Sequence, residues 1–159
     1  MDAPANDGRR ETEKERLDRN LNELLGELRV ALPGVQVLFA FLLAVPFNAG
    51  FEDATDFQKD VYLVTLLLTA VATALLIAPS AYHRIEFRQD DKRHIVFISN
   101  TFAIAGFGFL AAAMSSAVLL VTDYLFGATT AVICTVGTAV ILYGFWYALP
   151  VARRIKIGD

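Results

Sequence analysis

Cysteine and histidine are scarce in this chain of 159 residues, which contains one cysteine and two histidines. A lone Cys134 excludes a disulfide within the chain and any thiol-pair redox chemistry. His83 and His94 flank one charged loop, without the H-x-x-x-H spacing or the cysteines that zinc sites use. We therefore expect no metal site and no cofactor.

Charge is missing from four long apolar runs. They cover residues 30–47, 61–82, 95–121 and 127–149, and none contains Asp, Glu, Lys or Arg. A helix of about 20 mostly apolar residues crosses the hydrocarbon core of a bilayer. The runs predict an all-α, polytopic membrane protein with four transmembrane helices in residues 30–151. Proton-coupled transporters, intramembrane proteases and haem enzymes need charged or histidine side chains inside their spans, so the runs argue against these classes and against an enzyme.

Lysine and arginine are concentrated in three segments. Six of the 14 precede residue 30, four lie between residues 84 and 93, and three lie in the basic tail, residues 152–159. Only Lys59 lies elsewhere. Short loops rich in Lys and Arg stay in the cytoplasm, and four spans place these three segments on one side. Both termini are therefore predicted to be cytoplasmic.

Residues 11–29 predict an amphipathic helix before the first span. Its apolar stripe consists of Leu17, Leu21, Leu24, Leu25 and Leu28, which recur at helical spacing. Helices that lie on anionic lipid have a polar face rich in Lys and Arg, whereas this segment is rich in acids. We expect the stripe to pack on its own bundle, on a second copy or on a partner. Residues 1–10 show no periodic pattern and are predicted to be disordered.

The loop between the second and third spans is the most highly charged short stretch. Arg84 and Arg88 share a face if the second span continues as a helix. Three uses compete: contacts with lipid phosphates, salt bridges to Glu23 or Glu27 of the leading helix, and a ligand site. A third hypothesis, a membrane enzyme acting on a phosphorylated headgroup, would need the same arginines with His83.

Neutral polar residues remain inside the spans. Thr65, Thr69 and Thr73 line one face of the second span. Such faces commonly pack against another helix, with each hydroxyl bonded to its own backbone. A sharper hypothesis is that Gln36, Thr69, Thr73 and Asn100 surround a polar cavity that binds a neutral solute or a lipid headgroup.

Three segments carry a resemblance to a known family. They are RLDRNLNELLGELRVALPGVQVLFAFLLAVPF (16–47), APSAYHRIEFRQDDK (78–92) and VLLVTDYLFG (118–127). The chain resembles the uncharacterised small membrane proteins of actinobacteria and related bacteria, which form a domain family of unknown function. The resemblance implies four spans in a bacterial cytoplasmic membrane, and it supplies no activity or catalytic residue.

Two functional hypotheses follow from these features. The first is a non-enzymatic scaffold or accessory subunit that acts through the leading helix and the charged loop. The alternative is a small oligomeric transporter or channel for a neutral solute, which would use the polar faces. The expected partners are the lipid bilayer and either a second copy or another membrane protein, and no nucleic acid.

Overall fold

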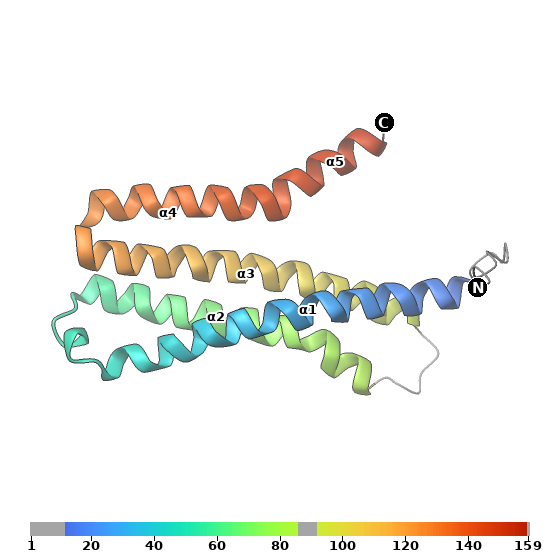
Figure 1. Ribbon diagram of the computed structural model, residues 1–159, viewed down its shortest axis with the longest axis horizontal. Helices are drawn as coiled ribbons and strands as arrows, with labels where there is room; N and C mark the ends of the chain where they lie inside the picture. The colour runs from blue at the N-terminus through green and yellow to red at the C-terminus, as the bar shows by residue number, and fades with distance from the viewer. Residues whose placement is uncertain (1–11, 86–91, 159) are drawn as a thin grey trace, which may run out of the picture.

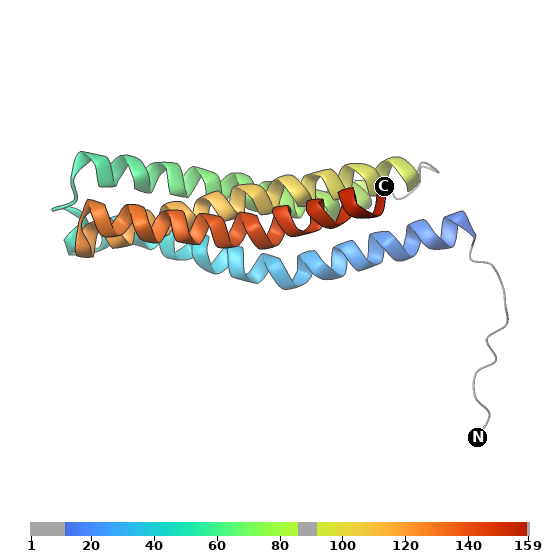
Figure 2. The same cartoon turned by 90° about the horizontal axis from the view of Figure 1, so that it is seen from above.

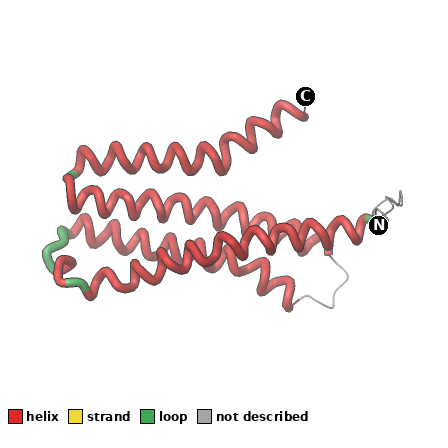
Figure 3. The backbone as a smooth tube through the Cα atoms, viewed as in Figure 1, coloured by secondary structure: helices red, strands yellow, loops and turns green. Residues whose placement is uncertain are grey.

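The computed structural model describes residues 12–85 and 92–158, and all of its regular elements are helical. The long helices lie side by side and are joined by short connections (Figure 1, Figure 3). Their bounds are α1 Glu13–Ala44, η1 Val45–Phe47, η2 Ala49–Phe51, α2 Asp56–Ile85, α3 Lys92–Phe126, α4 Ala128–Tyr143, η3 Gly144–Ala148 and α5 Leu149–Gly158. The predicted disorder of residues 1–10 lies outside the described residues.

Four helical segments are long and apolar enough to cross a membrane. They are Glu13–Phe47, Asp56–Ile85, Arg93–Phe126 and Ala128–Lys156. The predicted all-α, polytopic fold is confirmed, and the helices continue beyond the apolar runs. The start of α1, the end of α2, the start of α3 and α5 lie at the same end of the bundle, here named the terminal end (Figure 1). The opposite end, with residues 45–55 and Gly127, is named the loop end.

Helix α1 joins the predicted leading helix of residues 11–29 to the first span without a break. Its buried side chains recur every seven residues, or about two turns, along one side: Leu21, Leu28, Val35 and Leu42. Pro33 lies inside α1 and cannot donate the backbone hydrogen bond of a helix interior. The middle of α1 bends in Figure 2, so the Pro33-Gly34 pair bends the helix and does not begin it.

A capping box begins α1. The Thr12 hydroxyl accepts the Glu15 backbone N–H, with 3.3 Å between the two heavy atoms. The Glu15 carboxylate in turn accepts the backbone N–H and the hydroxyl of Thr12, each at 2.8 Å. The hydrogen bonds from the Thr12 backbone, and then from its side chain, lower the pKa of Glu15 below its ordinary value.

Acid is expected to loosen the first turn of α1. A carboxyl whose pKa is lowered by folding stabilises the folded turn above its ordinary pKa, and that contribution is lost as the pH falls through the lowered value. NMR amide signals of residues 13–16 should therefore shift toward coil positions below the ordinary carboxyl pKa of 4.5. A Glu15→Gln variant should lose this pH dependence. An unchanged dependence in that variant would contradict the assignment.

The contact between α2 and α3 forms the core of the bundle. Small buried side chains are frequent on both helices: Thr65, Thr69 and Ala72 on α2, and Ser99, Ala103, Ala111 and Ala113 on α3. At Gly106 the approach is so close that a Cβ atom would lie 2.8 Å from Leu76 Cγ and Cδ2. Small residues let membrane helices approach in this way. Leu28 and Val35 of α1 complete the apolar cluster.

Helix α4 packs on α3 and points most of its large apolar side chains outward. Val132, Ile133, Val136 and Val140 are each more than half exposed, as suits a surface that faces lipid tails. The chain then widens into the π-helix η3. The hydroxyls of Tyr143, the last residue of α4, and Tyr147 of η3 donate to the Gly108 and Ile104 carbonyls of α3, at 3.0 and 2.5 Å. These bonds fix the end of α4 against α3.

Helix α5 contains most of the predicted basic tail of residues 152–159, which is helical as far as Gly158. It continues directly from η3 and diverges from α3 (Figure 1). All side chains from Leu149 to Lys156 are exposed. The terminal end therefore carries a basic helix that stands apart from the bundle.

Candidate functional site

An open groove of about 490 Å³ lies between α1 and α3 at the terminal end. On α1 its lining residues are Leu17, Asn20, Leu21, Glu23, Leu24 and Glu27, and on α3 they are Arg93, Val96, Phe97 and Asn100. Its lining combines apolar leucine, valine and phenylalanine side chains with charged and amide groups. This surface is named the α1/α3 groove.

Helical periodicity explains why these residues meet. Arg93, Val96, Phe97 and Asn100 follow the i, i+3, i+4, i+7 spacing, which places them on one face of α3. On α1, the groove is lined by Leu17, Leu21 and Leu24, which belong to the leucine stripe. The stripe packs on its own bundle through Leu21 and Leu28, which are 6% and 1% exposed.

The charges of the groove are unequally divided between its two sides. Glu23 and Glu27 are exposed one turn apart on α1, and Arg93 lies across from them on α3. Glu23 forms a salt bridge with Arg19 of its own helix, with 3.5 Å between Glu23 Oε1 and Arg19 Nη1, and both side chains are more than half exposed. Exposed pairs of this kind contribute at most about 1 kcal/mol, so Glu23 can exchange its partner at little cost. The chemistry of the lining suits binding of an amphipathic, basic ligand rather than covalent catalysis.

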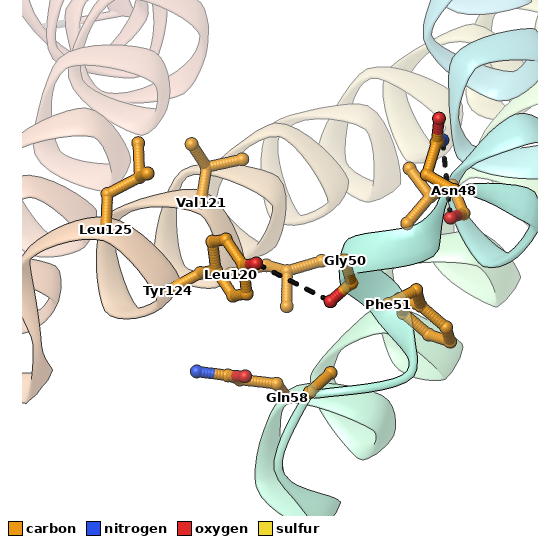
Figure 4. Close-up of a pocket in the computed structure, with 10 residues that line it drawn as sticks. Asn48, Gly50, Phe51, Gln58, Leu120, Val121, Tyr124 and Leu125 are labelled. Carbon is orange, nitrogen blue, oxygen red and sulfur yellow. Dashed lines mark hydrogen bonds between the residues drawn. The ribbon is translucent and has the colours of Figure 1, made fainter.

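A second pocket, of about 320 Å³, lies at the loop end (Figure 4). Its lining residues are Val45, Asn48, Gly50, Phe51, Ala54, Gln58, Leu120, Val121, Tyr124 and Leu125. In Figure 4 the ring of Tyr124 extends from α3 toward the α1–α2 connection, where its hydroxyl donates to the Gly50 carbonyl at 3.5 Å. A Cβ atom at Gly50 would lie 3.0 Å from that hydroxyl, so glycine permits the approach.

Gln58 is the polar centre of the loop end. It is 8% exposed, and its amide nitrogen donates to Asp123 Oδ2 at 2.9 Å. Its amide oxygen accepts the Thr55 backbone N–H at 3.1 Å, while the Thr55 hydroxyl accepts the Gln58 N–H at 3.2 Å. This reciprocal pair is a capping box that begins α2. Gln58 therefore ties the start of α2 to the end of α3.

Asn48 and Tyr62 complete the loop-end network. The Asn48 amide donates to the Ala44 carbonyl at 3.0 Å, and the Tyr62 hydroxyl donates to the Leu42 carbonyl at 3.1 Å. Tyr62 also meets Phe51 edge to face, with 5.1 Å between ring centroids. The donors of these side chains are used within the chain, so the pocket presents a mainly apolar wall.

The residues of the predicted polar cavity are placed separately. Thr69 has no exposed surface and Thr73 is half-buried, and their hydroxyls donate to the Thr65 and Thr69 carbonyls, both at 2.8 Å. Gln36 and Asn100 are exposed on α1 and α3. A fully buried Thr69 cannot line a cavity with them. The threonine face packs against α3, where the Thr65 and Ser116 hydroxyls meet at 2.7 Å.

The residues predicted to contact lipid headgroups or a partner also lie in different parts of the structure. Glu23, Glu27 and Asn100 come together in the α1/α3 groove. Arg84 is exposed at the end of α2, and Arg88 lies outside the described residues. Within the described ranges, no cluster of three or more His, Cys, Asp and Glu side chains could hold a metal ion.

Sequence reasoning missed Arg93 and Phe97 in the groove and Gln58 and Asp123 at the loop end. The signal for the first pair was the i, i+4 spacing on the solvent-facing start of α3. The signal for Gln58 was the Thr-x-x-Gln capping pattern immediately before an apolar run. Nothing local indicated that Asp123, 65 residues further along the chain, would accept its amide.

Neither curated proteins nor solved structures match the chain significantly. A family model does: the family of unknown function DUF6328 matches residues 10–150. The matched region contains α1 to α4, the α1/α3 groove and the loop-end pocket. The chain therefore belongs to the family of unknown function DUF6328.

Proposed function

We propose that this protein is a non-enzymatic scaffold or accessory subunit of a bacterial cytoplasmic membrane, which holds a partner helix in its α1/α3 groove. The observation that carries the proposal is the groove itself, whose lining combines apolar side chains with two carboxylates and a guanidinium. Amphipathic helices bind to such grooves through apolar anchors spaced by three or four residues. Basic residues beside those anchors would face Glu23 and Glu27.

The position of the groove supports this proposal. At 1.5 Å per residue, the 32 residues of α1 span about 48 Å, well beyond the roughly 30 Å of a hydrocarbon core. The α1 side of the groove, residues 17–27, precedes the apolar run that begins at residue 30. The groove would thus open at the membrane surface, on the side that the Lys and Arg distribution assigns to the cytoplasm.

The alternative function, a small oligomeric transporter or channel, would need the polar groups of the spans to face a solute pathway. The hydroxyls of Thr65, Thr69, Thr73, Ser115, Thr122 and Thr138 instead donate to carbonyls four residues earlier in their own helices. Such back-bonding satisfies the hydroxyl in a packed interface. This arrangement supports the scaffold.

Site-specific photo-crosslinking in bacterial membranes tests the proposal. A photoreactive residue in place of Asn20, in the groove, should give a protein adduct of defined mass. Combining it with Glu23→Lys and Glu27→Lys should remove the adduct, because the carboxylates then repel a basic partner. The control position is Phe47, which is 89% exposed at the loop end. Lipid adducts alone at both positions, or solute flux in proteoliposomes that Gln36→Leu abolishes, would contradict the scaffold.

A further inference from the structure

The terminal end carries a basic element as well as an acidic groove. Helix α5 displays Arg153, Arg154 and Lys156 together with Val151 and Ile155, which are 53% and 65% exposed. Ile155 and Val151 are one turn apart, as apolar anchors of a docked helix are. The end of α4 and η3 are fixed to α3 by the Tyr143 and Tyr147 hydroxyls, so α5 projects from a rigid base.

The α1/α3 groove has the complementary chemistry. Its apolar lining residues include Leu17, Leu24 and Phe97, which is itself 71% exposed, and Glu23 and Glu27 line its α1 side with negative charge, opposite the single Arg93 on α3. Its volume of about 490 Å³ accommodates a few side chains rather than a whole helix. One turn of α5, with an isoleucine and adjacent basic residues, matches that size and charge.

The two elements of one chain do not meet. α5 continues directly from η3, diverges from α3 in Figure 1, and stands apart from α1 in two perpendicular views (Figure 1, Figure 2). Copies that insert in one direction into one membrane present the same element at the same depth. Because α5 and the groove both lie at the terminal end, α5 of one copy is level with the groove of its neighbour.

We propose that α5 of a second copy docks in the α1/α3 groove, with Ile155 against its apolar lining residues and the basic residues of α5 against Glu23 and Glu27. A two-fold axis along the membrane normal makes the exchange reciprocal, so each copy gives one helix and receives one. This inference rests on the proposed function, because it names the partner of the same groove. It makes the scaffold a self-associating one.

Cysteine crosslinking between two differently tagged copies tests the docking. Both copies carry Cys134→Ser, one carries Asn20→Cys in the groove, and the other carries Ile155→Cys on α5. Mild oxidation after co-reconstitution in liposomes should give a disulfide-linked heterodimer, which only contact between copies can produce. Phe47→Cys, at the loop end, replaces Asn20→Cys in the matched control and should give no such product.

Charge-reversal variants distinguish specific docking from chance collision between copies. Glu23→Lys with Glu27→Lys in the groove copy should lower the heterodimer yield about tenfold or more, since like charges then face each other. Arg153→Glu with Arg154→Glu in the α5 copy should do the same. Combining the two reversed copies should restore the yield.

Two results of the charge reversals would overturn the inference. One is a yield that ignores the charge reversals, and the other is a yield that follows the fraction of anionic lipid rather than Glu23 and Glu27. The second outcome would place α5 on lipid headgroups. If α5 fails to crosslink while the photoreactive groove position still captures a different protein, the second-copy inference is wrong and the scaffold function stands. If the groove captures only lipid, both are wrong.

Discussion

Replacing Gly106 by leucine is expected to cost about 2–3 kcal/mol of the free energy of unfolding, through overpacking of the α2–α3 contact. A Cβ atom at this position would already lie 2.8 Å from Leu76 Cγ and Cδ2 and 3.3 Å from Leu75 Cβ. Leu76 has no exposed surface, so its side chain has no free space into which to move. The larger side chain must therefore push α2 and α3 apart.

The matched control for this variant is Gly137→Leu. Gly137 lies inside α4, and a Cβ atom there would meet nothing within 4 Å. Both variants gain the same helix propensity of roughly 1 kcal/mol over glycine, so the difference between them measures packing alone. Unfolding in a graded mixture of mild and denaturing detergent, followed by circular dichroism, gives both values. Equal stabilities would show that the α2–α3 contact is not close-packed at Gly106.

A graded series sharpens the test. Gly106→Ala should lose less than Gly106→Leu, because a single methyl group is displaced more easily and the gain in helix propensity offsets part of the clash. The order glycine, alanine, leucine at residue 106 should therefore be one of falling stability, and the same order at residue 137 should not.

The fold class could be predicted because its signal is carried by single segments. Four uncharged runs, each long enough to span a bilayer, determine four helices whatever their packing. The continuity of α1 could not be predicted in the same way. Pro33-Gly34 is a local sign of a helix boundary, but a membrane helix tolerates a missing backbone hydrogen bond when its neighbours hold it in place. The heptad of Leu21, Leu28, Val35 and Leu42 across the proline was the stronger signal.

The candidate site was less predictable because it depends on which faces meet. Periodicity places Thr69 and Thr73 on one face of α2, but it does not say whether that face meets another helix or a cavity. The packing of α3 on α2 decides this, and it buries Thr69 completely. Glu27 and Asn100 likewise belong to different helices, and only the pairing of α1 with α3 brings both to one groove. Local pattern identifies faces, and tertiary packing selects their partners.

The hydrogen bond from Gln58 to Asp123 is expected to be worth more than any other single side-chain bond at the loop end. It joins two helices, involves an amide that is 8% exposed, and has a carboxylate as its acceptor at 2.9 Å. Hydrogen bonds to charged groups contribute about 1.5–3 kcal/mol, and removing one partner also leaves the other buried and unpaired. Asp123→Leu should therefore lower the free energy of unfolding by about 2 kcal/mol.

Conservative and paired variants separate this bond from the rest of the network. Asp123→Asn keeps an acceptor oxygen and should lose less than Asp123→Leu. Asp53→Leu, at an exposed carboxylate in the α1–α2 connection, should stay within about 0.5 kcal/mol of the wild type. Gln58→Leu also removes one half of the capping box that begins α2. The direct interaction is therefore given by the double-mutant cycle of Gln58→Leu and Asp123→Leu, with an expected coupling of about 1 kcal/mol or more. Additive losses in that cycle would mean that Gln58 stabilises the protein only as the cap of α2, and that the loop end is not held to α3 by this bond.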